Sequence, residues 1–244
     1  MVRPLFYSDS SFVDGQLVEL EGDEGRHAAT VRRMRTGEPI SLTNGTTLYC
    51  HGVVETVDAK SLTVRVNEVQ AIAQPKLRFE LIQALAKGDR DEMAIQAATE
   101  LGIDNVTPWQ SARSIVKWDQ TKAAKSIDRW QSICDEAAKQ SLRPNFVSVG
   151  ELVTTSSLVR SISLYAKLLV LDPTAADSLV DLELPDEGIV GLVVGPEGGI
   201  ADDELTALEQ AGAIRVRLGS GILRTSTAGS AALAVLSASS GRWQ

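Results

Sequence analysis

The chain has 244 residues, of which 43% are hydrophobic and 23% are charged, close to the averages for globular proteins. This composition excludes extended disorder and collagen-like structure, and no apolar run approaches the roughly 18 residues of a membrane-spanning helix. The formal net charge of −8 argues against a protein that coats nucleic acid without specificity. The length predicts one large domain or two modest ones.

Cysteines and histidines are few. Cys50 and Cys134 lie far apart in the sequence and make no disulfide framework, so we expect a reducing, cytoplasmic environment. With His27 and His51 as the two histidines and no CxxC or HxxxH pattern, we expect no metal site. The first residues lack the apolar run of a secretory signal, and we expect no membrane association.

Short strands are predicted throughout residues 1 to about 70, where β-branched residues alternate with polar ones around an Asn44-Gly45 turn. Residues 24–35 have a helical pattern with Ala28, Val31 and Met34 on one face. We therefore expect a small β-barrel that carries one basic helix and ends in a linker at 70–75. The clearest strands are predicted over 38–43, 48–57 and 61–66.

From residue 77 onward, strands and helices alternate, which predicts a mostly parallel sheet covered by helices. In the first of these helices, Met93, Ala97 and Leu101 share the apolar face. The closing helix is apolar nearly all round, so it must be covered on most sides. Strands are predicted over 77–86, 104–108, 146–149, 167–171, 189–194 and 214–218. Helices are predicted over 89–101, 120–140, 151–162, 201–210 and 225–239.

Two glycine-bearing loops follow the last two long strands. Residues 194–200 read VGPEGGI and residues 218–229 read LGSGILRTSTAG. Glycine permits positive φ and close approach of a ligand to the backbone, and ligands of open α/β sheets bind at the carboxyl ends of strands. Each loop alone also fits an ordinary turn or a capped helix start, but two at neighbouring strand ends favour a binding site. Neither matches a dinucleotide or P-loop fingerprint.

Two groups of charged residues stand out. Glu136, Lys139, Gln140 and Arg143 share a helix face, and Pro144 ends that helix so that Arg143 could meet a ligand. Five basic residues crowd into positions 26–35, which indicates a contact with an anion on an otherwise acidic protein. A solvated helix face is the alternative interpretation for both groups.

Five motifs taken together resemble the ribosomal RNA small subunit methyltransferase E family, which belongs to the SPOUT class of S-adenosylmethionine-dependent RNA methyltransferases. They occur in order along the whole chain, and GPEGG followed by LGxxILRT is the most specific part. One departure is Ser226-Thr227-Ala228, where many members have Glu-Thr-Ala, which puts a charge-based role at position 226 in doubt. The motifs are HAATVRRMRTG at 27–37, KGDRDEMAIQAATELG at 87–102, EAAKQSLR at 136–143, VGPEGG at 194–199 and LGSGILRTSTA at 218–228.

The resemblance implies a PUA-like β-barrel domain for RNA binding at 1–72 and a SPOUT α/β domain with a trefoil knot and a parallel sheet at 73–244. It also implies a homodimer that methylates N3 of a uridine in the decoding region of 16S rRNA, with S-adenosylmethionine as cofactor and the small ribosomal subunit as partner. The closing helix supports a dimer independently, because its small apolar residues permit close approach of another helix.

Site residues follow from these motifs. The expected cofactor-binding residues are Leu171, Gly195, Glu197, Gly198, Gly199, Leu218, Gly219, Ile222, Leu223, Arg224, Thr225 and Ala228. The expected catalytic residues are Arg143 and Arg224, which would stabilise the anion that develops on the uracil oxygens, and Glu136, which would orient an arginine or accept the proton. The expected RNA-binding residues are Arg3, Arg26, His27, Arg32, Arg33, Arg35, Lys87 and Arg90.

Three other functions are weighed against this one. A knotted ribose 2′-O-methyltransferase would use the same cofactor pocket, and the position of the product methyl group distinguishes it. A non-catalytic RNA-binding assembly factor would fail to bind S-adenosylmethionine. A nucleotide-dependent oxidoreductase has the least support because the chain lacks GxGxxG.

Overall fold

The computed structural model describes residues 3–243, the side chain of Gln120 excepted. Contacts within the chain define two units, which are described separately. The N-terminal unit comprises the residues up to 74 together with 138–146, and the C-terminal unit comprises 75–137 together with the residues from 147 on. The division predicted from the sequence placed 138–146 in the second domain, whereas in the structure this segment has its contacts with the first.

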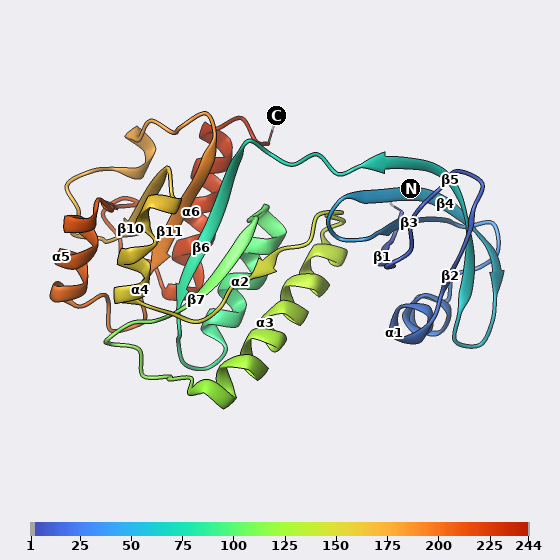
Figure 1. Cartoon of the computed structure of the whole chain (residues 1–244), viewed down its shortest axis with the longest axis horizontal. Helices are drawn as coiled ribbons and strands as arrows, with labels where there is room; N and C mark the ends of the chain where they lie inside the picture. The colour runs from blue at the N-terminus through green and yellow to red at the C-terminus, as the bar shows by residue number, and fades with distance from the viewer. Residues whose placement is uncertain (1–2, 244) are drawn as a thin grey trace. The chain divides into compact units, whose positions relative to one another are not determined.

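The N-terminal unit is built on a curled five-stranded sheet of order β1-β3-β4-β5-β2 (Figure 1). β1 pairs with β3 in parallel, and the other neighbours are antiparallel. β5 continues through Ala71, so the predicted linker at 70–75 begins too early. The strands are β1 (Leu5–Tyr7), β2 (Leu17–Leu20), β3 (Pro39–Thr43), β4 (Leu48–Val57) and β5 (Leu62–Ala71).

Alternate residues of these strands fill the core of the curled sheet. Ile40, Leu42 and Val64 are fully buried there together with Ala28. Cys50 is buried in the same cluster as a free thiol, and burial raises its pKa to about 11. Side chains of one strand alternate between its two faces, so the residues between these point outward.

The predicted helix at 24–35 is shorter and differently wound. Helix α1 (Gly22–Arg26) passes directly into the π-helical turn η1 (His27–Val31). Ala28 and Met34 are buried as expected, but Val31 is 69% exposed. The prediction for Val31 was wrong because the wider π turn rotates residues away from the three- and four-residue spacing of an α-helix. Arg33 then takes a left-handed conformation (φ 54°), which ends the helical run.

Segment 138–146 packs against the outside of the same sheet. The Thr43 hydroxyl donates to the carbonyl of Pro144 at 2.6 Å, and the Phe146 amide donates to the carbonyl of Gly45 at 2.8 Å. Lys139 forms an ion pair with Glu24, whose other oxygen accepts from the Tyr7 amide. These contacts cover part of the outer face of β1 and β3.

The C-terminal unit contains a seven-stranded parallel sheet of order β12-β10-β11-β6-β7-β8, with β9 also paired to β7 (Figure 1). The strands are β6 (Leu77–Ala84), β7 (Asn105–Gln110), β8 (Ser148–Val149), β9 (Val153–Thr154), β10 (Lys167–Leu171), β11 (Gly188–Val194) and β12 (Ile214–Val216). The helices are α2 (Arg90–Leu101), α3 (Gln120–Gln140), α4 (Thr155–Arg160), α5 (Asp202–Ala211) and α6 (Thr225–Ser239), with short turns η2 (Ile162–Leu164) and η3 (Leu179–Asp181).

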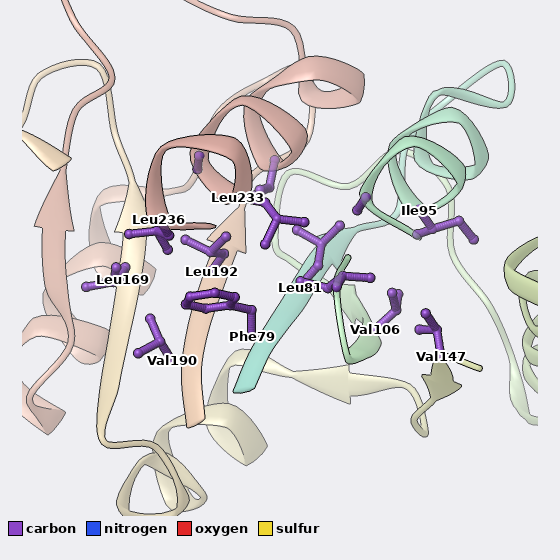
Figure 2. Packing of buried hydrophobic residues seen from close by; sticks show 14 of the residues in the cluster. Phe79, Leu81, Ile95, Val106, Val147, Leu169, Val190, Leu192, Leu233 and Leu236 are labelled. Atoms are coloured by element: carbon purple, nitrogen blue, oxygen red, sulfur yellow. The ribbon is translucent and has the colours of Figure 1, made fainter. Parts of the chain in front are cut away.

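Helices cover both faces of this sheet. On one face, strand residues such as Leu81 and Leu192 pack against Ile95 of α2 and Leu233 of α6 (Figure 2). On the other face, Leu158 of α4 and Leu208 of α5 pack against the sheet. Together with the curled N-terminal sheet, this arrangement confirms the expected α/β fold class.

Two predictions within the C-terminal unit were wrong. Met93 is 58% exposed, because α2 turns Ala94, Ile95 and Ala98 toward the sheet instead. The predicted helix at 151–162 is wrong in its first four residues, of which the last two form strand β9, and α4 starts only where the Thr154 hydroxyl caps it. In the described part of the chain, no helix is both long enough and apolar enough to cross a membrane.

Candidate functional site

A pocket of about 610 Å³ lies where three neighbouring strands of the parallel sheet end. β12, β10 and β11 are adjacent, and the residues that follow each of them form its walls. Ten of the twelve predicted cofactor residues line this pocket: Leu171, Gly195, Glu197, Gly199, Leu218, Ile222, Leu223, Arg224, Thr225 and Ala228. Gly198 and Gly219 belong to the same two loops but are not among the lining residues.

The loop after β11 has no room for a side chain at its first glycine. A Cβ atom on Gly195 would lie 2.7 Å from Cγ1 of Ile200, closer than real Cβ contacts. Gly199 has φ of +71°, and its amide donates to the Pro196 carbonyl at 2.9 Å. The Arg113 guanidinium donates to the carbonyls of Gly198 and Ile200, both at 3.2 Å, and so holds the loop from outside. No sequence motif pointed to Arg113.

The loop after β12 presents apolar side chains to solvent at the pocket. Ile222 is 83% exposed, and Leu223 is also exposed. Behind them, the buried Thr225 hydroxyl donates to the Gly195 carbonyl at 2.8 Å and accepts from Nε2 of Gln83 at 2.9 Å. This bridge joins the two loops of the pocket to β6. Gln83 is fully buried, and its role was not predicted.

Glu197 acts as a hydrogen-bond acceptor at the pocket. Its carboxylate accepts from the Lys87 amide at 3.1 Å and from the Arg90 guanidinium at 2.8 Å. Burial works to raise the pKa of Glu197, but these hydrogen bonds outweigh it and hold the pKa below its ordinary value. A carboxylate that is held in its ionised form in this way is a poor proton acceptor, so Glu197 is better suited to orienting Arg90 and the Lys87 amide.

Sequence reasoning missed a second acidic position in the pocket. Asp172 follows β10 directly and is buried, and it accepts from Nε of Arg215 at 2.9 Å and from the Thr174 hydroxyl at 2.8 Å. Burial works to raise the pKa of Asp172, but its bonds to Thr174 and Arg215 lower it overall. The strand-end rule that identified the two glycine loops also applies to the end of β10. The other lining residues that were not predicted for the cofactor are Arg90, Pro173, Thr174, Val194, Pro196, Ile200, Asp202, Leu205, Val216 and Gly221.

The predicted catalytic residues belong to both units. Arg224 lines the pocket and is exposed. Arg143 and Glu136 are absent from the described residues that line it. Arg143 follows the end of α3 in segment 138–146, where its amide donates to the Ala138 carbonyl at 2.8 Å. The roles assigned to Arg143 and Glu136 stay predictions.

The predicted RNA-binding residues occupy both units. In the N-terminal unit, Arg32, Arg33 and Arg35 are exposed beyond η1, and Arg26 pairs with Asp23. The His27 ring packs edge-on against Phe6, with ring centroids 5.6 Å apart. Arg3 is exposed ahead of β1. In the C-terminal unit, Lys87 and Arg90 are exposed; the Arg90 side chain lines the pocket described above, and the Lys87 backbone amide bonds to Glu197 of its lining.

Comparison with known proteins decides the family. Residues 73–237 match the RNA methyltransferase domain family, and residues 20–67 match the RNA methyltransferase PUA domain. A ribosomal RNA small subunit methyltransferase E of Mycobacterium bovis is 40% identical over all of this chain and 94% of its own length. The chain belongs to this methyltransferase family. The resemblance found in the sequence motifs is thereby confirmed.

Solved structures of similar proteins agree with this family. A methyltransferase from Legionella pneumophila, in complex with the cofactor S-adenosylmethionine, has 33% identity and a TM-score of 0.88, with 98% of both chains covered. A ribosomal RNA small subunit methyltransferase E from Neisseria gonorrhoeae, bound to S-adenosylmethionine, has 30% identity and a TM-score of 0.87, covering 97% of this chain and 98% of that one. Both share the fold of this methyltransferase over nearly its full length.

Proposed function

We propose that this methyltransferase transfers a methyl group from S-adenosylmethionine to 16S rRNA of the small ribosomal subunit, at N3 of a uridine in the decoding region. The observation that carries the proposal is the pocket at the ends of β10, β11 and β12, lined by both glycine-bearing loops. The names of the relatives and the cofactor in the two similar structures support the same activity. A ribosomal substrate also agrees with the cytoplasmic location expected from the cysteines.

The pocket residues fit S-adenosylmethionine in shape and charge. Leu171, Leu218 and Leu223 supply apolar walls for the adenine ring, and the missing side chain at Gly195 leaves backbone exposed to its polar edge. The amino-acid part of the cofactor carries an ammonium and a carboxylate group. The acidic Asp202 and Glu197 offer negative charge for the ammonium group. Arg90, which pairs with Glu197, offers positive charge for the carboxylate group.

When bound, S-adenosylmethionine supplies a methyl carbon on a positively charged sulfur, and transfer forms a bond from this carbon to N3, breaks the carbon–sulfur bond and releases the N3 proton. The protein's part is mainly to position the two reactants, which can supply about 7–11 kcal/mol of the barrier at best. Arg224, an exposed cation at the pocket, stabilises the negative charge that develops on the uracil oxygens. From the family motifs alone, we assign Arg143 the same role and Glu136 the role of orienting an arginine side chain.

RNA binding is assigned to the exposed basic residues of the N-terminal unit and to Lys87 and Arg90. Folded RNA is recognised largely through its shape and its phosphates, so an acidic protein can bind it through a local basic surface. Affinity for 16S rRNA should therefore fall steeply with salt concentration. In the N-terminal unit these residues are the exposed Arg3, Arg26, Arg32, Arg33 and Arg35, together with the half-buried His27.

A homodimer is part of the proposal. Ala231, Ala234 and Val235 of α6 are only half-buried within one chain, although the helix is almost entirely apolar. Small residues of this kind allow a second helix to approach closely, and burying them stabilises an interface. Light scattering at micromolar concentration should give the mass of two chains, and a clean monomer would contradict the dimer.

The activity is tested by incubating small ribosomal subunits with S-adenosylmethionine labelled in the methyl group and digesting the RNA to nucleosides. The proposal predicts label in N3-methyluridine. Label on a ribose would indicate the 2′-O-methyltransferase instead, and the absence of both label and cofactor binding would indicate a non-catalytic assembly factor. The Arg224→Ala variant, measured at a saturating concentration of S-adenosylmethionine, should lose most of the single-turnover rate.

A further inference from the structure

A second cavity, of about 410 Å³, lies entirely within the N-terminal unit, on the outer face of the curled sheet. Leu5, Ser41 and His51 are direct register neighbours across β1, β3 and β4. Tyr49 lies two residues before His51 on the same strand and therefore on the same face. Strand pairing thus brings these four side chains to one side of the sheet, opposite the core.

The floor of this cavity carries polar atoms and aromatic rings. Oγ of Ser41 and Nδ1 of His51 are 2.9 Å apart, and the Tyr49 hydroxyl bonds to Gln70. The rings of Tyr49 and His51 meet edge to face, with centroids 5.5 Å apart. Burial lowers the pKa of His51 below its ordinary value, Arg3 lowers it further, and Glu68 opposes the shift. A neutral imidazole can both donate and accept hydrogen bonds.

The wall of the cavity contains a strained residue. Leu142 has φ of +59° and is 39% exposed. Its amide donates to the Lys139 carbonyl, and the Arg143 amide donates to the Ala138 carbonyl. These two bonds define a Schellman end to α3, in which the left-handed position is normally glycine. A leucine there costs conformational energy that glycine would avoid, so its side chain has a use other than ending the helix.

We infer that this cavity binds an unpaired nucleobase of the RNA substrate, with Arg3 on the adjoining phosphate. Leu142, Pro144 and the Tyr49 ring offer surfaces for the flat face of a base, while Ser41 and His51 offer hydrogen bonds for its edge. Sequence-specific recognition of RNA depends on splayed-out bases held in this way. The inference rests on the proposed RNA substrate, but none of these residues lines the pocket at the ends of β10, β11 and β12.

The test uses the full chain and two single-stranded RNAs of about ten nucleotides, one of uridines and one in which abasic riboses replace the bases. Affinities are measured by fluorescence anisotropy for the unaltered chain and for Leu142→Gly. The control variant is Leu17→Ala, which truncates another exposed leucine of the same unit. Arg3→Gln is compared with Lys60→Gln, an exposed lysine outside the cavity.

The unaltered chain should bind the uridine strand about tenfold more tightly than the abasic strand. Leu142→Gly should bring this ratio close to one while its melting temperature stays the same or rises, and Leu17→Ala should keep the ratio. Arg3→Gln should weaken binding of both strands more than Lys60→Gln does. Equal binding of the two strands by the unaltered chain, or an unchanged ratio in Leu142→Gly, would overturn the inference.

Labelled methyl transfer to small subunits is measured on the same preparations. Transfer together with equal binding of the two strands would leave the proposed function standing and remove the base-binding cavity. Base-dependent binding without methyl transfer would support the base-binding cavity and contradict the proposed function.

Discussion

The two cavities described above are made in different ways. The pocket of the C-terminal unit is formed by loops that follow strands, and its most constrained position, Gly195, contributes backbone only. The cavity of the N-terminal unit is formed by side chains that register places across three strands, closed by the end of a helix. The first kind leaves a contiguous sequence motif, and the second kind does not, which is why only the first was predicted.

The largest expected effect concerns the backbone character of the first pocket. Gly195→Ala should lower the affinity for S-adenosylmethionine about ten- to hundredfold, because the new Cβ would lie 2.7 Å from the stiff, β-branched Ile200. Calorimetry measures the affinity of this variant and of the unaltered chain, and circular dichroism checks that the variant is folded. Equal affinities would mean that the cofactor does not depend on the absence of a side chain at Gly195.

The hydrogen bonds of Thr225 connect the first pocket to the core of the C-terminal unit. Thr225→Val removes the hydroxyl that bridges Gln83 and the Gly195 carbonyl, so the buried Gln83 amide keeps only the Ala84 carbonyl as an acceptor. It should lower the free energy of unfolding by about 1–3 kcal/mol. Thr227→Val makes the same change at an exposed position of the same helix and should have little effect. Chemical denaturation measures both, and similar losses would contradict the bridge.

Measuring stability as a function of pH distinguishes Asp172, the buried carboxylate of the first pocket, from carboxylates on the surface. The folded-state pKa of Asp172 lies below its ordinary value of 3.8, so its ionised form stabilises the fold above that pH. This contribution is lost as the pH falls through the lower, folded-state pKa. The stability difference between the unaltered chain and Asp172→Asn should therefore be full near neutral pH and shrink in strong acid. Asp186→Asn, at an exposed position, is the control for the loss of one surface carboxylate.

The smallest expected effect concerns the second cavity. The pKa of His51, followed by NMR, should lie below its ordinary value of 6.5. Arg3→Gln removes one cause of the shift and should raise this pKa, whereas Glu68→Gln removes the opposing carboxylate and should lower it further. Shifts in the other directions would mean that Arg3 and Glu68 do not face the imidazole as described.

Regular patterns in the sequence predicted much of the fold. The predicted bounds of β4, α3, β10 and α6 agree with the structure, because each is a long or strongly apolar run. Failures occurred where local winding or tertiary contacts override periodicity. The π turn of η1 exposes Val31, and α2 buries Ala94 and Ile95 in place of Met93.

The sequence predicted one site better than the other for a related reason. The glycine loops could be located because a buried parallel strand directly precedes each of them. Arg113 and Gln83, by contrast, reach those loops from distant parts of the chain through hydrogen bonds that no local pattern encodes. The same holds for segment 138–146, which looked like the end of an ordinary amphipathic helix until its contacts with the curled sheet were known.

The left-handed leucine that ends α3 has a practical consequence for protein engineering. A screen for thermal tolerance would favour glycine at position 142, since glycine avoids a penalty of about 1 kcal/mol or more. Because Leu142 forms part of the wall of the base-binding cavity, the glycine variant would be more stable to heat but would discriminate less between RNA substrates. Selection for thermal stability alone would thus lower the specificity for RNA, although the selected variant would fold normally.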